Sequence, residues 1–104
     1  MKSLTDYANG ELSVIHARSK RLNRLLKKDH SHALLEMMAK HVKEIKELHR
    51  KKNRHYVIET GDLLVLCLEL IKEAKRSPDA VLSTCYLRFY KKLSGLLESQ
   101  NPHK

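Results

Sequence analysis

The sequence has few of the residues that interrupt regular structure, since only three glycines and two prolines occur in 104 residues. Sustained alternation of apolar and polar residues, the pattern of a half-buried strand, is also nearly absent. Apolar residues instead recur with the 3.6-residue period of an amphipathic helix. We therefore predict an all-α fold of four helices.

Long apolar runs are missing as well. The longest uninterrupted one, residues 63–68, has six residues, whereas a membrane-spanning helix needs about 20. The first residues turn polar before the apolar part of a signal peptide forms. The only cysteines, Cys67 and Cys85, both fall inside predicted helices, which is typical of reduced thiols and not of a disulfide scaffold. We expect a cytoplasmic protein with no membrane partner.

The helical period also indicates where each helix begins and ends. The predicted helices cover residues 4–27, 31–50, 54–75 and 77–98. The whole chain, 1–104, then forms one domain with a basic N-terminal helix, three further helices and a loose tail, over residues 1–28, 31–98 and 99–104. Ser31 and Asn53 are candidate N-cap residues, and Ser77 followed by Pro78 is a strong signal for a helix start. We expect the two middle helices to form an antiparallel hairpin.

Acidic residues are the minority charge, because 12 Asp and Glu stand against 21 Lys and Arg and give a formal charge of +9. The acids of the third predicted helix nevertheless lie within about 80° of one another on an ideal helical wheel. They are Glu59, Asp62, Glu69 and Glu73. One acidic line therefore runs along an otherwise apolar helix.

The candidate site consists of two acidic pairs on consecutive helices, Glu44-x-x-Glu47 and Glu59-x-x-Asp62. Residues at i and i+3 share a helix face, so two such pairs on facing antiparallel helices can converge. Four carboxylates at one point repel unless a hard cation lies among them. Mg²⁺ takes oxygen ligands and commonly bridges carboxylates to substrate phosphates.

Each pair also has an ordinary interpretation. Glu44 and Glu47 suit an exposed face that forms ion pairs with neighbouring Lys and Arg, which is the commoner outcome for such spacing. Asp62 is harder to explain in this way, because it precedes the apolar run and burial of an unpaired carboxylate is costly. Gly61 costs about 1 kcal/mol relative to alanine inside a helix, which a close backbone or ligand approach, or simple helix packing, would explain.

Three segments resemble one known superfamily, in the right order. Residues 58–64, with Glu59-x-x-Asp62, resemble the ExxD helix of the all-α nucleoside triphosphate pyrophosphohydrolases. These include the MazG-like proteins, the dimeric dUTPases and phosphoribosyl-ATP pyrophosphohydrolase. Residues 43–48, with Glu44-x-x-Glu47, resemble the ExxE helix of that superfamily. Residues 77–82 and 88–93 are similar to the MazG-type last helix, in which an aspartate-proline start precedes a basic and aromatic stretch.

The resemblance implies a MazG-like bundle and an activity. Such enzymes cleave a nucleotide between its α- and β-phosphates and release pyrophosphate. By this likeness, Mg²⁺ (or Mn²⁺) would be held by the catalytic residues Glu44, Glu47, Glu59 and Asp62. The phosphates of the nucleotide substrate would be bound by Lys43, Arg88, Lys91 and Lys92, some of them from a neighbouring subunit. Exposed apolar area on the first and last helices favours a homodimer or homotetramer.

The chain departs from the family pattern at two positions. Lys43 stands where the family commonly has the first of two glutamates, so that a positive charge lies beside the metal ligands. Tyr86 stands where MazG-like proteins commonly have asparagine. Reduced activity, an unusual substrate and loss of catalysis are all compatible with these changes.

The excess of basic residues supports a different function, that of a degenerate or unrelated helical protein that binds nucleic acid or another anionic partner. Residues 18–28 contain six Lys and Arg and no acid. However, basic residues occur on all four predicted helices and form no single stripe, and five aromatic residues offer little stacking surface. A basic surface also suits an enzyme that attracts triphosphates.

Histidines, cysteines and aromatic residues have ordinary interpretations. The seven histidines contain no His-x-x-x-His pair, so we predict surface or turn histidines in preference to a histidine metal site. Cys67 and Cys85 suit small core residues. Tyr86, Phe89 and Tyr90 favour packing between helices over stacking on a base.

Overall fold

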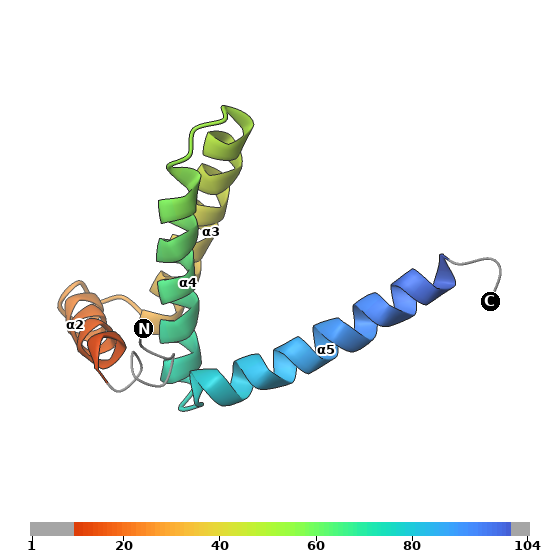
Figure 1. The fold of residues 1–104 in the computed structure, drawn as a ribbon. Helices are drawn as coiled ribbons and strands as arrows, with labels where there is room; N and C mark the ends of the chain where they lie inside the picture. The colour runs from red at the N-terminus through yellow and green to blue at the C-terminus, as the bar shows by residue number, and fades with distance from the viewer. Residues whose placement is uncertain (1–9, 101–104) are drawn as a thin grey trace.

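The computed structural model describes residues 10–100, in which all regular structure is α-helical (Figure 1). The four helices are α2 (Glu11–Leu25), α3 (His30–Arg50), α4 (Tyr56–Glu73) and α5 (Pro78–Ser99). The prediction of an all-α fold with four helices is confirmed for this range. The start of the first predicted helix, before residue 10, and the last four residues of the predicted tail lie outside the described residues.

Side-chain caps mark the starts of α3 and α5, whereas α2 and α4 begin without one. Ser77 caps α5 as predicted, because its Oγ accepts a hydrogen bond from the Ala80 N–H at 3.4 Å. The prediction that Ser31 caps α3 is wrong. Asp29 does so, and its carboxylate accepts from the His32 N–H at 2.9 Å. The prediction that Asn53 caps α4 is also wrong, because the N-cap is His55 and no side chain caps this helix. Asn53 Oδ1 instead accepts from the His55 N–H at 2.9 Å in the turn before α4.

A lysine in the left-handed conformation lies two residues after the end of each of α2, α3 and α4. The φ angles are 57° at Lys27, 59° at Lys52 and 61° at Lys75. The residue after each lysine donates its N–H to a carbonyl five positions earlier, at 2.8, 2.9 and 3.3 Å. This is the Schellman arrangement that usually employs glycine. The chain therefore reverses sharply at these points although it contains few glycines.

α3 and α4 pack together as the predicted antiparallel hairpin, and α2 contacts both of them at the base of the hairpin (Figure 1). The buried apolar side chains lie in this region. They are Leu12, Ala33, Leu34, Leu66 and Leu68. Val65 and Leu82, from α4 and α5, pack against Leu12 and Leu68.

Only the second half of α4 is buried, although its sequence is apolar almost all round. Leu66 and Leu68 lie in the core, whereas Val57, Ile58 and Leu64 are at least half exposed. The apolar sequence of this helix therefore leads to burial only near the base of the hairpin.

α5 extends away from the other helices beyond its first turns (Figure 1), and the described molecule measures 60 × 35 × 30 Å. Its apolar face is largely exposed, including 72% of Tyr86 and 63% of Phe89. Within one chain these aromatic residues do not pack between helices as predicted. Nowhere in residues 10–100 does a helix combine the length and apolar character that crossing a bilayer requires.

Candidate functional site

The predicted acidic line runs along α4, and both of its halves meet histidines. Near the turn between α3 and α4, two of the acids approach a histidine of α3. We call this group the tip cluster, comprising His41, Glu44, Glu59 and Asp62. Near α2, the other two acids approach histidines of α2 and α3. We call that group the base cluster, comprising His16, His30, Glu69 and Glu73.

The tip cluster is organised around His41. Its Nε2 lies 3.3 Å from Glu59 Oε2 and 3.8 Å from Asp62 Oδ2. Its Nδ1 lies 2.9 Å from the carbonyl oxygen of Met37, and because a carbonyl only accepts, Nδ1 carries the proton. Nε2 of a neutral ring therefore directs a lone pair at the carboxylates. That geometry requires either a protonated ring or a cation between these groups.

Glu44 joins the same group. One donor atom from each of His41, Glu44 and Glu59 lies within 4.8 Å of the other two. Glu59 is well covered and also faces His55, whose Nε2 is 3.5 Å from Glu59 Oε1. Asp62 is 56% exposed, so the argument that it is a buried carboxylate is wrong. The oxygen-rich set fits a divalent cation that retains several waters.

Glu47 takes part in different contacts. Its Oε1 lies 2.6 Å from Arg50 Nη2 and 3.3 Å from Lys51 Nζ. Hydrogen bonds from Arg50 and then from Lys51 hold the pKa of the Glu47 carboxyl below its usual value. The ordinary interpretation of Glu47 as an exposed, ion-paired side chain is thus confirmed. Of the four predicted metal ligands, Glu44 and Glu59 lie together with His41, and Asp62 contacts His41.

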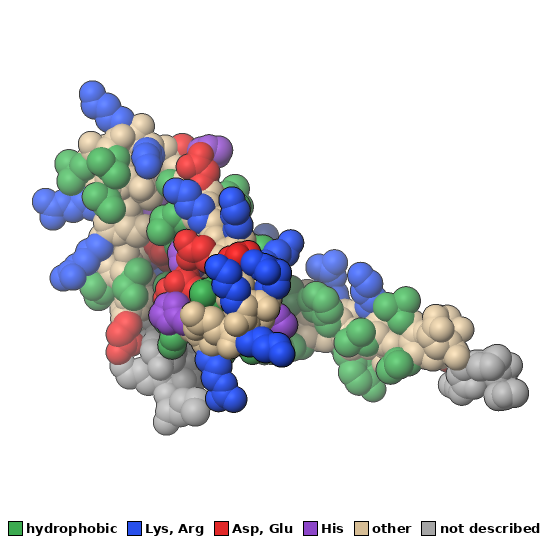
Figure 2. All heavy atoms as spheres, turned by 90° about the horizontal axis from the view of Figure 1, so that it is seen from above, with side chains coloured by type: hydrophobic (Ala, Val, Ile, Leu, Met, Phe, Trp, Pro, Cys, Tyr) green, Lys and Arg blue, Asp and Glu red, His purple; other side chains and the backbone are tan. Residues whose placement is uncertain are grey.

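The predicted phosphate-binding residues fall in two places. Lys43 borders an open hollow of about 360 Å³ together with Lys40, Glu44 and Glu47. Seen from above the tip of the hairpin, acidic and histidine side chains lie among Lys and Arg side chains (Figure 2). The positively charged side chain of Lys43 therefore lies beside the acidic residues in the folded protein as well as in the sequence.

Arg88, Lys91 and Lys92 lie on α5, where they line a hollow of about 430 Å³ with Cys85 and Phe89. Glu59 is in the first turn of α4, whereas α5 follows the opposite end of that helix. An 18-residue helix is about 27 Å long. One chain alone therefore does not bring these cations to the tip cluster.

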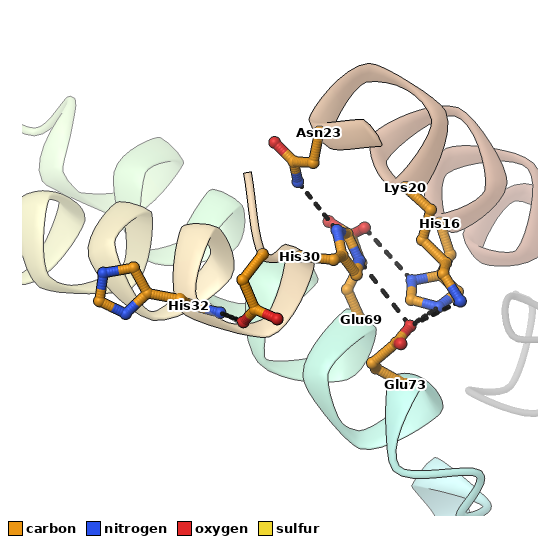
Figure 3. A network of polar contacts seen from close by, with 8 residues as sticks. His16, Lys20, Asn23, His30, His32, Glu69 and Glu73 are labelled. Carbon is orange, nitrogen blue, oxygen red and sulfur yellow. Dashed lines mark hydrogen bonds and ion pairs between the residues drawn. The ribbon is translucent and has the colours of Figure 1, made fainter. Parts of the chain in front are cut away.

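The base cluster was missed by the sequence argument. His16 of α2 places Nδ1 at 3.4 Å from Glu69 Oε1 and Nε2 at 3.0 Å from Glu73 Oε2 (Figure 3). His30 Nε2 lies 3.9 Å from Glu73 Oε2. The expectation of surface or turn histidines is wrong for His16, which is 8% exposed. The sequence did contain one indication of this cluster. Glu69 and Glu73 lie on an apolar helix, and acids that are buried there need polar partners.

The structure also shows the surroundings of Gly61 and of the two cysteines. A Cβ at Gly61 would meet no described atom within 4 Å, so helix packing within this chain does not account for the glycine. Cys67 and Cys85 are free thiols, and burial raises the pKa of the Cys67 thiol, which opposes a role as nucleophile.

Comparison with known proteins yields no match to a protein-family model, to a curated protein or to a solved structure.

Proposed function

We propose that the protein is a Mg²⁺-dependent nucleotide pyrophosphohydrolase with its active site at the tip cluster. The observation that carries the proposal is the convergence of donor atoms from His41, Glu44 and Glu59 within 4.8 Å, with Asp62 beside them. Glu44, Glu59 and Asp62 would hold the ion, with Mn²⁺ as an alternative. When bound, the metal ion would neutralise the charge of the triphosphate and activate the attacking water.

The protein residues around this position have separate tasks. His41 is fixed by the Met37 carbonyl, which leaves the Nε2 lone pair available as a further ligand for the ion beside Glu59 and Asp62. Lys43, at the rim of the adjoining hollow, binds a phosphate oxygen as the substrate enters. Glu47 joins the cation only after it leaves Arg50 and Lys51, which its exposed position permits.

A second copy of the chain completes the site in this proposal. The apolar face of α5 exposes 55% of Leu93 and 72% of Leu97, a large unpartnered surface for a small domain. Pairing of these faces in a homodimer or homotetramer would bury them. It would also carry Arg88, Lys91 and Lys92 of α5 toward another subunit's tip cluster.

The test is an assay of the purified chain with Mg²⁺ and a panel of canonical and modified nucleoside triphosphates, in which pyrophosphate is measured separately from phosphate. We expect pyrophosphate release that EDTA stops. Glu59→Gln and Asp62→Asn should lower turnover by about 100-fold or more, because each weakens the hold on the ion. Unchanged turnover in both variants would overturn the site, and absence of pyrophosphate with every triphosphate would overturn the function.

The matched control is Glu36→Gln. Glu36 Oε1 lies 2.8 Å from His32 Nε2 in an exposed pair on α3, so it has the same chemistry as Glu59 without its place in the cluster. Turnover of this variant should equal that of the unmodified protein. Equal melting temperatures for all variants would show that lost turnover does not reflect lost structure.

One observation favours the alternative function, binding of an anionic polymer. Lys75, Arg76 and Arg88 line a further open hollow of about 410 Å³ at the start of α5. That function would be supported by tight DNA or RNA binding that weakens steeply with salt, together with no pyrophosphate release from any triphosphate.

A further inference from the structure

The base cluster and the adjoining Asn23 contain the most deeply buried polar side chains of the described residues. Glu69 is 3% exposed, and His16 and Asn23 are each 8% exposed. They come from two helices, and His30 at the start of α3 adds a third (Figure 3). Burial of so many polar groups in one place is costly unless they are matched to one another or to a ligand.

Three buried atoms of this cluster have no hydrogen-bond partner among the described residues. They are His16 Nδ1, His30 Nε2 and Glu69 Oε1, whereas Glu73 Oε2 lies within ion-pair distance of His16 Nε2 and Lys20 Nζ, at 3.0 and 3.3 Å. An unsatisfied buried polar atom costs roughly 1–3 kcal/mol, and folded proteins contain few of them. Their convergence on one point is characteristic of donors arranged around a shared cation.

The protonation of His16 leads to the same conclusion. A neutral imidazole has one N–H, yet both ring nitrogens of His16 face carboxylate oxygens. The shorter contact, 3.0 Å, assigns the proton to Nε2, which donates to Glu73 Oε2. Nδ1 then directs its lone pair at Glu69 Oε1, 3.4 Å away. Adjacent ligand atoms of a tetrahedral zinc ion are about 3.3 Å apart, so this separation suits two ligands of one ion.

We propose that His16 Nδ1, His30 Nε2 and Glu69 Oε1 bind a divalent transition-metal ion such as Zn²⁺. One donor atom from each of these residues lies within 4.8 Å of the other two. Two imidazoles and one carboxylate form a recognised zinc ligand set that leaves a fourth position for water or another donor. Glu73 borders that position, since its Oε2 is 3.9 Å from His30 Nε2.

The neighbouring contacts fit ligands of this kind. Metal-binding histidines usually donate their other N–H to a carboxylate or carbonyl group, which fixes the ring. Glu73 has this role for His16, and Lys20 Nζ, 3.3 Å from the same oxygen, offsets its charge. The amide of Asn23 lies 2.8 Å from His30 Nδ1. A half-turn of that amide presents its oxygen to an Nδ1–H, since oxygen and nitrogen have the same shape there.

The metal ion would hold α2 against the hairpin of α3 and α4, because it would bind residues of all three helices. α2 buries only Leu12 among its apolar side chains, so apolar contact alone holds this helix weakly. Because the unfolded chain lacks the assembled ligands, binding of the ion would stabilise the docked arrangement. This proposal is independent of the activity at the tip cluster.

The test is metal binding by the purified full-length chain after treatment with EDTA and dialysis. Zn²⁺ is titrated in competition with a chromophoric chelator, and Co²⁺ is followed by its visible absorption. We expect one tight equivalent, the bands of a low-symmetry Co²⁺ site and a higher melting temperature with Zn²⁺. Glu69→Gln and His30→Gln should remove the bands and weaken Zn²⁺ binding at least tenfold, as expected for loss of a ligand.

Two controls separate this site from the other histidines. His32→Gln alters an exposed histidine that pairs with Glu36, and it should leave Zn²⁺ binding unchanged. In the second control the titration is repeated with the Glu59→Gln variant, which lacks a carboxylate of the tip cluster. This variant should still bind the one equivalent of Zn²⁺ that is lost in Glu69→Gln. Asn23→Ala, which retains every proposed ligand, should weaken binding about 10–100-fold and covers the case in which Glu69→Gln does not fold.

The proposal is overturned if the folded protein binds no Zn²⁺ at micromolar concentration, or if Glu69→Gln, His30→Gln and Asn23→Ala all bind it as tightly as the unmodified chain. In the first case a protonated His16 joins the two carboxylates without a metal. In the second case the bound ion lies elsewhere.

Discussion

At the tip of the hairpin, Glu59 and Asp62 of α4 face one histidine of α3, whereas at its base Glu69 and Glu73 face histidines of both α2 and α3. The chemical groups are the same, but Asp62 is 56% exposed and Glu69 is 3% exposed. Water weakens the ion pair of Asp62 at the tip, while burial makes an unmatched charge on Glu69 at the base costly. The base is therefore suited to holding the fold together, and the tip to exchanging ligands.

The largest expected effect comes from deleting a carboxylate at each end. Glu69→Ala should lower the free energy of unfolding by about 4 kcal/mol, because it leaves buried histidine groups without their partner. Asp62→Ala should lower it by less than about 0.5 kcal/mol, since its ion pair with His41 is exposed to water. Urea denaturation of the two variants measures the difference, and equal losses would remove the contrast between base and tip.

Apolar side chains should show the same division. Leu34, near the base, is fully buried at 0% exposure, whereas Leu64, nearer the tip, is 50% exposed. Leu34→Ala should cost about 3 kcal/mol of stability through lost burial and the cavity that remains. Leu64→Ala should cost less than about 1 kcal/mol. A larger loss for Leu64 in a concentration-dependent denaturation would instead indicate that a second subunit covers this side of α4.

Gly61 offers a test of opposite sign at the tip. Gly61→Ala should raise the free energy of unfolding by about 0.5–1 kcal/mol, because alanine favours the helix and its methyl group meets no described atom within 4 Å. Thermal denaturation checks the stability, and the pyrophosphate assay checks the site. A more stable variant that has lost turnover would indicate that the substrate approaches the backbone at this position.

The smallest effect is expected for the exposed pair of His32 and Glu36, whose side chains are 70% and 58% exposed. His32→Gln should change the free energy of unfolding by less than about 0.5 kcal/mol. A loss comparable to that of Glu69→Ala would show that burial does not explain the behaviour of the base cluster.

The sequence was most informative about local structure. Helical periodicity predicted the hairpin of α3 and α4, and Ser77 with Pro78 predicted the start of α5, because these signals depend on neighbours in the chain. The N-cap of α3 was misplaced by two residues, since Asp29 and Ser31 are both good cap residues and local sequence does not distinguish them.

The candidate site was predicted in part. Glu44, Glu59 and Asp62 come together with His41, but Glu47 is held by Arg50 and Lys51, which lie three and four residues further on. The burial of His16 was not predictable from periodicity, because it depends on how α2 crosses the base of the hairpin. Likewise, the apolar pattern of α5 predicts a contact surface and leaves its partner undetermined.

The most direct test of the account is a crystal structure of the full chain grown with both Zn²⁺ and Mn²⁺ and a slowly hydrolysed triphosphate analogue, with anomalous scattering recorded at each metal edge. We expect zinc between His16, His30 and Glu69, and manganese between Glu44, Glu59 and Asp62 in contact with the phosphates. Anomalous peaks absent from both clusters, or manganese bound away from the tip, would contradict both assignments.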